Sequence, residues 1–182
     1  MDSFATHMAT NESFIKAFQP QSIFEFGMGR YSTPLFVQAC LKTVSVEMQE
    51  ASWYNTIIQE LKDADPDRFL PVLALDRFLG CHMLEGSPDN YDLVFVDGHG
   101  YSRWAQVAAG YSKSHALIVH DTEAHIYEWS RVNIPEGWSA VELRGEYAWT
   151  TVLTDMSNIV DWAMTLPEPF PFTSFAEKGY AR

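Results

Sequence analysis

The stretch YDLVFVDGHG, residues 91–100, decides the fold class that this sequence predicts. Within it, Asp92–Val96 (DLVFV) is a nearly continuous apolar run that ends at Asp97-Gly98. A short run of this kind is typical of a strand buried on both faces, as in a parallel sheet covered by helices on both sides. The stretch therefore predicts an interior strand of an α/β domain.

Short β-rich runs alternate with longer amphipathic segments on both sides of this stretch. The predicted strands are Ser22–Phe26, Thr43–Glu47, Pro71–Leu75, Asp92–Val96, Ala116–Val119, Ser139–Leu143 and Trp149–Leu153. The predicted helices are Thr33–Leu41, Glu50–Ala64, Arg77–Leu84, Tyr101–Ser112 and Glu123–Val132. Because the last two strands follow each other through Gly145, they form an antiparallel pair. The pattern predicts an α/β fold: a doubly wound, Rossmann-like, mostly parallel seven-stranded sheet with a C-terminal antiparallel β-hairpin and helices on both faces.

The chain has 182 residues, which corresponds to about one domain. We expect a single domain over residues 1–182, with a core over about 20–155 and an arm rich in aromatic residues and prolines over 156–182. The role of the arm is open, since an oligomer contact and a lid both suit an extended segment such as Pro167–Pro171. A homodimer is therefore one expectation for this chain.

The charge balance narrows the class of partner. The chain has 12 Lys and Arg against 24 Asp and Glu, a net charge of -12. A field of this sign repels phosphate backbones and anionic lipids, so we expect no nucleic acid and no membrane partner, and a cationic or neutral small ligand instead. The first residues lack the basic region of a secretory signal, and Cys40 and Cys81 lie far apart. These features predict a cytoplasmic protein with reduced cysteines.

A glycine turn follows the first predicted strand. Gly27 and Gly29 allow a tight turn and a close backbone approach to a ligand, and Ser32 or Thr33 can cap the helix that follows. A turn between a strand and a helix is where dinucleotide folds hold phosphate or nucleoside groups. A nucleotide site and a plain strand-to-helix turn both fit these residues.

Carboxylates follow the next two predicted strands. Glu47 lies 20 residues beyond Gly27 and can accept hydrogen bonds from both hydroxyls of a ribose. Met48 can pack on an adenine face or belong to the core. Asp76 stands where an acid can accept from an adenine amino group. For Glu47, a solvated position at the end of a strand is the alternative.

A second polar cluster follows the fourth and fifth predicted strands. Asp97 and His99 come after one strand, and His120 and Asp121 after its neighbour, with His125 further along. Two carboxylates with nearby imidazoles can hold Mg²⁺ or Mn²⁺, in which case Asp97 and Asp121 are the metal ligands. The same groups can instead leave a histidine as general base. A third reading is that Asp121 or Thr122 only caps the predicted helix at Glu123–Val132.

The positions of two further histidines and of the tryptophans in the predicted fold do not suggest a functional role. His7, His82 and the six tryptophans are expected to be core or helix-packing residues. They are left out of the predicted site for this reason.

The pattern Glu25-x-Gly27-x-Gly29-x-x-Ser32 resembles the first motif of the class I S-adenosylmethionine-dependent methyltransferases. Glu47 is similar to the acid that binds the cofactor ribose in that family. Ser32 stands where the common pattern has a third glycine. The resemblance implies that all five residues contact the cofactor.

Further stretches extend the resemblance over about residues 20–155. Asp76 is similar to the adenine-contacting acid of the family. YDLVFVDGHG and ALIVHDTE resemble its fourth- and fifth-strand motifs, in the form seen in small-molecule O-methyltransferases related to the catechol and macrocin types. SAVELRG followed by WTTVLTD is similar to its last two strands. Metal-dependent relatives carry a second carboxylate or Asn beside the fifth-strand Asp, whereas Asp121 is flanked by His120 and Thr122.

The resemblance implies a methyltransferase that uses S-adenosylmethionine and modifies a small molecule at a hydroxyl. Asp97, which is also expected at the cofactor, would position or deprotonate the acceptor with the help of His99 or His120, directly or through Mg²⁺ or Mn²⁺. A cationic sulfonium suits a cleft lined by the acidic side chains Glu25, Glu47, Asp97 and Asp121.

Three alternatives stay open at this stage. An enzyme of the same fold can use the cofactor for another transfer or for cleavage, and an inactive relative can bind it as an assembly protein. An NAD-type binder is the third, but it expects a G-x-G-x-x-G loop and no terminal hairpin.

Overall fold

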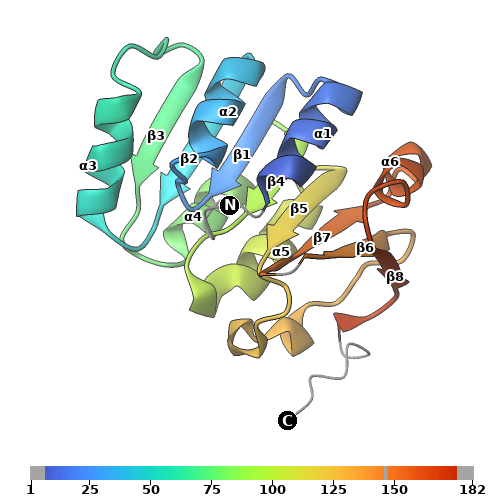
Figure 1. Cartoon of the computed structure of the whole chain (residues 1–182). Helices are drawn as coiled ribbons and strands as arrows, with labels where there is room; N and C mark the ends of the chain where they lie inside the picture. The colour runs from blue at the N-terminus through green and yellow to red at the C-terminus, as the bar shows by residue number, and fades with distance from the viewer. Residues whose placement is uncertain (1–6, 146, 176–182) are drawn as a thin grey trace.

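The computed structural model describes residues 7–145 and 147–175, and its centre is one eight-stranded sheet (Figure 1). The spatial order of the strands is β3-β2-β1-β4-β5-β7-β6-β8. The strands are β1 Ser22–Phe26, β2 Lys42–Glu47, β3 Phe69–Leu73, β4 Leu93–Val96, β5 Ala116–His120, β6 Ser139–Arg144, β7 Trp149–Thr154 and β8 Pro169–Phe172. Strands β1 to β5 pair in parallel, whereas β7 runs antiparallel to both β5 and β6.

This topology confirms the predicted fold class. Strand β7 is inserted antiparallel between β5 and β6, so the C-terminal pair continues the sheet next to β5 rather than forming a separate unit. The dinucleotide-binding fold has six parallel strands in the order 3-2-1-4-5-6, so the NAD-type alternative loses its structural basis.

Helices cover both faces of the sheet because successive strand residues point to opposite sides. On β1, Ile23 belongs to the apolar cluster under α1, α2 and α6, whereas Phe24 belongs to the cluster under α4 and α5. Helix α3 packs through Ile57 against Phe69 at the β3 end of the sheet. The helices are α1 Met8–Phe18, α2 Ser32–Ala39, α3 Ala51–Glu60, α4 Leu79–Gly86, α5 Arg103–Tyr111 and α6 Ser157–Ala163. None of the helices among the described residues is long and apolar enough to span a membrane.

The C-terminal arm contains an additional strand. Residues Pro169–Phe172 form β8, which pairs antiparallel with β6 and makes the sheet eight strands wide instead of seven. The strand lies at the edge of the sheet, where proline is tolerated because one side of the strand needs no ladder hydrogen bond. The described part of the arm is thus α6 and a sheet strand, and residues 176–182 of the predicted arm lie outside the described residues.

The predicted helix over Glu123–Val132 does not form. Two short 3₁₀ turns, η3 His125–Tyr127 and η4 Trp129–Arg131, take its place. Glu128 between them has a left-handed backbone with φ of 54°, which interrupts any continuous helix. Trp129 is only 1% exposed and stacks on Phe175, so burial of this indole sets the local path of the chain.

Candidate functional site

The carboxyl ends of the parallel strands border a cleft made of two adjoining hollows that share Gln49. The larger hollow has a volume of about 730 Å³ and the smaller one of about 650 Å³. The residues discussed below from the larger hollow are His7, Gly27, Gly29, Glu47, Trp53, Asp97, Arg103, His120 and Asp121. Those from the smaller hollow are Met48, Asp76 and His99. This edge is where open α/β sheets bind ligands.

The turn after β1 approaches β4 so closely that it requires glycine. Gly27 has a φ of +84°, and a Cβ atom there would lie 2.4 Å from the carbonyl oxygen of Asp97. The Gly27 N–H donates to the carbonyl of Val46 at 2.8 Å, which ties the turn to β2 as well. Gly27 and Gly29 both line the larger hollow, so the predicted backbone approach to a ligand is sterically open.

Glu25 supports this turn from behind instead of lining the cleft. Its carboxylate is fully buried and accepts hydrogen bonds from the hydroxyls of Ser32 at 2.5 Å, Thr33 at 2.7 Å and Ser45 at 2.6 Å. Burial raises the pKa of Glu25 to about 7, against the opposing effect of the three hydroxyl donors. Neither Glu25 nor Ser32 lines either hollow, so the expected direct contact of these two residues with a cofactor is replaced by a supporting role.

Glu47 lies at the end of β2 with its carboxylate fixed in position. It is 2% exposed and lines the larger hollow. Its Oε1 atom accepts the backbone N–H groups of Gln49 at 2.7 Å and Glu50 at 3.1 Å. No residue of the described ranges donates to Oε2, which leaves this oxygen for a ligand hydroxyl. The placement suits the predicted ribose-binding role.

The smaller hollow brings Met48 and Asp76 together, as predicted for an adenine site. Met48 packs against the turn after β4 so tightly that a Cβ atom on Gly98 would meet its Cε atom. Asp76 is exposed, and its Oδ1 atom accepts the backbone N–H of Phe78 at 2.9 Å. The Met48 side chain beside the Asp76 carboxylate suits the face and the amino edge of an adenine ring.

His99 belongs to this smaller hollow as well. Asp97 and His120 line the larger one, so the structure separates His99 from the pair that it was expected to assist. The His99 ring contacts Tyr101, with 5.7 Å between ring centroids. His99 therefore lies with Met48 and Asp76 in the smaller hollow, and this placement does not support its predicted catalytic role.

A buried arginine joins the two carboxylates of the second cluster. The guanidinium of Arg103, near the start of α5, donates to Asp97 Oδ1 at 2.8 Å and to Asp121 Oδ2 at 3.2 Å. It also donates to the carbonyl oxygens of Gly98 and His120 and lies 4.2 Å from the centroid of the Tyr127 ring. The two carboxylates therefore share one guanidinium, which offsets part of their charge.

This arrangement does not fit Mg²⁺ or Mn²⁺ held by Asp97 and Asp121 as a pair. The guanidinium occupies the position between the carboxylates that such an ion would need, and a second cation there would be repelled. The capping alternative for Asp121 or Thr122 is also wrong, because no α-helix begins between β5 and β6. Asp121 instead has a left-handed backbone with φ of 56°, a strained conformation that is common at functional sites.

His120 and Asp97 form an interacting pair at the ends of β5 and β4. The Nδ1 atom of His120 lies 3.3 Å from Asp97 Oδ1 and 3.3 Å from Asp121 Oδ1. Burial alone would lower the pKa of His120, but the hydrogen bond and charge of Asp97, with the charge of Asp121, raise it. Burial would raise the pKa of Asp97, but Arg103 and His120 outweigh it and lower the pKa to about 2.

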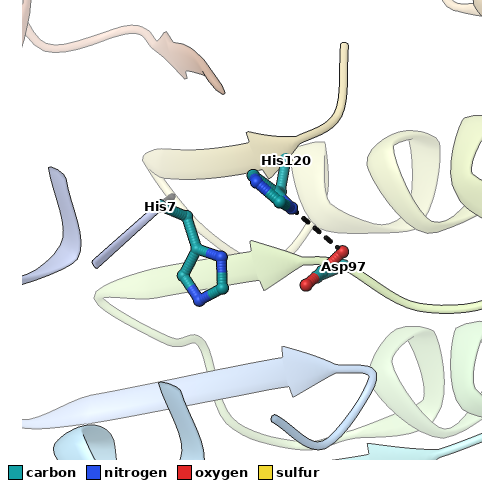
Figure 2. A group of neighbouring side chains, drawn as sticks. All are labelled: His7, Asp97 and His120. Atoms are coloured by element: carbon teal, nitrogen blue, oxygen red, sulfur yellow. Dashed lines mark hydrogen bonds and ion pairs between the residues drawn. The ribbon is translucent and has the colours of Figure 1, made fainter. Parts of the chain in front are cut away.

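His7 is a site residue that the sequence did not indicate. It precedes α1, is 3% exposed, and has its ring centroid 4.6 Å from that of His120 (Figure 2). Neither ring nitrogen has a hydrogen-bond partner among the described residues. Burial, with the neighbouring charge of His120, lowers the pKa of His7 to about 4, so the imidazole is neutral.

Two more lining residues escaped the sequence reasoning. Trp53 donates its indole N–H to the carbonyl of Met28 at 2.6 Å and lines the larger hollow. Arg103 carried one usable signal, a lone basic residue six positions after Asp97 in a strongly acidic chain. His7 carried none, because residues so distant in sequence meet only through the tertiary fold. His125, named as a further candidate, forms part of η3.

Known structures share this architecture. No protein-family model matches the chain, and no curated protein matches it in sequence. The O-methyltransferase TomG from Streptomyces achromogenes, in complex with S-adenosylmethionine, has a TM-score of 0.59 at 16% identity over 84% of this chain and 78% of that one. An O-methyltransferase from Bacillus cereus, in complex with S-adenosylhomocysteine, has a TM-score of 0.59 at 14% identity over 84% and 80% of the two chains.

The similarity extends to an enzyme of another specificity. The N-methyltransferase NodS from Bradyrhizobium japonicum has a TM-score of 0.59 at 11% identity over 84% of this chain and 97% of that one. The chain therefore has a Rossmann-like methyltransferase fold. More particularly, it is the fold of S-adenosylmethionine-dependent methyltransferases, several of them O-methyltransferases.

Proposed function

We propose that this chain is a methyltransferase that uses S-adenosylmethionine to methylate a hydroxyl of a small molecule. One observation carries the proposal: a single cleft joins an adenosine-type site to a pair of potential proton acceptors. Glu47 and the Gly27 turn lie in the same hollow as Asp97 and His120, and Asp76 lies in the adjoining one.

The residues of the cleft fit the cofactor. The backbone of Gly27 lines the larger hollow, the Glu47 carboxylate can accept from ribose hydroxyls, and Met48 with Asp76 can hold adenine. When bound, S-adenosylmethionine supplies a methyl group on a cationic sulfur. The net charge of -12 favours a cationic ligand and opposes a nucleic-acid substrate.

The acceptor belongs at the Asp97 end of the larger hollow. The bond between His120 Nδ1 and Asp97 fixes the orientation of the imidazole, as in other carboxylate–histidine pairs, and places both side chains at the cleft wall. These groups can orient a hydroxyl and take its proton as the methyl is transferred, and in-line transfer otherwise needs mainly alignment. His7 and Trp53 complete the walls around a small acceptor.

The experiment measures S-adenosylhomocysteine formation with a panel of phenols and other hydroxylated small molecules. Asp97→Asn is expected to lower turnover about 100-fold or more, because the amide no longer holds the His120 imidazole in its orientation. Its affinity for S-adenosylhomocysteine should stay within roughly threefold of the original value, since adenosine is held elsewhere. Asp63→Asn, an exposed change in the turn before β3, is the matched control and should leave both values unchanged.

Other outcomes separate the alternatives. Unchanged turnover in Asp97→Asn would remove Asp97 from the reaction. Consumption of the cofactor without a methylated product would favour cleavage or another transfer. Tight cofactor binding with no turnover on any acceptor, together with a stable complex with another protein, would favour an assembly role.

A further inference from the structure

We propose that His7, Asp97 and His120 bind one first-row divalent transition-metal ion, with Zn²⁺ as the reference ion, at the acceptor end of the cleft. Within residues 7–145 and 147–175 these are the only three His, Cys, Asp or Glu side chains that offer ligand atoms within 4.8 Å of one another. They come from the segment before α1, the end of β4 and the end of β5, and they face a common space (Figure 2).

The state of His7 is an independent sign of a ligand. A buried imidazole normally has hydrogen-bond partners for its ring nitrogens, because an unmade hydrogen bond in the interior costs free energy. Both nitrogens of His7 are buried without such a partner among the described residues, although the ring is next to His120. An ion between His7, His120 and Asp97 would give one of these nitrogens a partner.

Asp97 has an oxygen available for the ion. Arg103 and His120 both contact its Oδ1 atom, at 2.8 Å and 3.3 Å. No described residue donates a hydrogen bond to Oδ2, and Figure 2 shows one carboxylate oxygen directed to His120 and the other on the side of His7. Arg103 therefore prevents Asp97 and Asp121 from holding a metal ion between them, but it does not occupy the space next to His7.

The donor set selects the kind of ion. Two imidazole nitrogens and one carboxylate oxygen suit Zn²⁺, Fe²⁺ or Co²⁺, whereas Mg²⁺ prefers oxygen ligands alone. Ligand bonds of about 2.0–2.2 Å require the three atoms to come within roughly 3.5 Å of one another. The ligand atoms now lie within 4.8 Å of one another, so side-chain rotation has to close a gap of roughly 1.3 Å at most.

The surroundings resemble those of a site that keeps open positions. Three protein ligands are typical of catalytic zinc and non-haem iron sites, which leave coordination positions for water or substrate. All three residues line the larger hollow, and Asp121, 3.3 Å from His120 Nδ1, provides a neighbouring carboxylate. If the proposed function holds, an ion held by these residues would lie beside the acceptor hydroxyl and would favour its ionised form. Asp97 and His120 would then act as ligands of the ion rather than as direct bases.

The test uses the tag-free full chain, freed of metal by a chelator and titrated with ZnCl₂ by calorimetry. One Zn²⁺ per chain is expected, confirmed by elemental analysis of the dialysed protein. His7→Ala should weaken binding roughly 100-fold or more, since it removes one of three ligands. His82→Ala removes an exposed histidine outside the group and should leave binding unchanged. MgCl₂ should not compete.

A second measurement needs no variant. Co²⁺ added to the metal-free chain should give the visible absorption of a site with nitrogen ligands, displaced by one equivalent of Zn²⁺. Absence of stoichiometric binding, or equal affinity in His7→Ala, would overturn the inference. Because S-adenosylhomocysteine is titrated separately without metal, binding of the nucleoside but not Zn²⁺ overturns only the metal site. Binding of Zn²⁺ but not the nucleoside supports the metal site and contradicts the proposed function.

Discussion

At the scale of single residues, Gly27 imposes the tightest steric condition on the cleft. Its φ is positive, and a Cβ atom on this residue would lie 2.4 Å from the Asp97 carbonyl oxygen, which leaves no room for a side chain. Gly27→Ala should therefore destabilise the fold by about 1–3 kcal/mol and lower the affinity for S-adenosylhomocysteine, because the turn and the end of β4 must move apart.

Thermal unfolding and calorimetry measure these two effects. Gly86→Ala is the matched control, since a Cβ atom at Gly86 meets nothing within 4 Å and its φ is not in the left-handed region. That variant should be neutral or slightly more stable. A Gly27→Ala variant with unchanged stability and unchanged affinity for S-adenosylhomocysteine would show that the turn is not as tightly packed as described.

Glu25 predicts a pH dependence of stability. The pKa of Glu25 in the folded state, about 7, lies above the ordinary value of 4.5. The contribution of Glu25 to the free energy of unfolding is therefore fully present below pH 4.5 and is lost as the pH rises through 7. Glu25→Gln removes this titration. The free energy of unfolding of the variant, relative to the original chain, should rise by about 2–3 kcal/mol between pH 5 and pH 8.

Denaturant unfolding at several pH values measures this difference. A variant whose relative stability is constant with pH would contradict the buried, proton-binding state of Glu25. Because Glu25 lies behind the glycine turn, the same variant should retain the nucleoside site.

At the scale of elements, β8 is the part of the fold with the clearest stability test. Phe172 is 8% exposed and contacts Phe175, with 5.0 Å between ring centroids, whereas Phe170 on the same strand is 43% exposed. Phe172→Ala should lower the free energy of unfolding by about 3 kcal/mol, as expected for a truncated core aromatic. Phe170→Ala, the matched control, should cost less than about 1 kcal/mol. Equal losses in the two variants would mean that β8 does not pack as described.

The sequence predicted strands better than the segments that follow β5. Both ends of β1 were predicted correctly, because the apolar run and the flanking glycine are local signals. The helix expected over Glu123–Val132 was wrong, since the left-handed Glu128 and the burial of Trp129 depend on tertiary contacts. Strand β8 was missed because Pro169 and Pro171 are poor strand formers whose pairing with β6 depends on an edge position.

At the scale of the whole molecule, the candidate residues lie together where the sheet topology could be inferred from the sequence. Parallel strands bring their carboxyl ends to one edge, so Glu47, Asp97 and His120 could be grouped before their distances were known. His7 could not, because α1 brings it to that edge only through packing of the folded chain. Arg103 changes the chemistry of the group, since its guanidinium pairs with both carboxylates and offsets part of their charge.

The central claim is that this cleft binds the nucleoside of S-adenosylmethionine through Glu47. The most direct measurement is a calorimetric titration with S-adenosylhomocysteine, with NAD as the comparison ligand. Micromolar binding is expected for the original chain, with loss of about 10-fold to 100-fold in Glu47→Ala, because ribose hydroxyls would lose a fixed, buried acceptor. Weak or equal binding of S-adenosylhomocysteine and NAD, or full affinity in Glu47→Ala, would contradict the account.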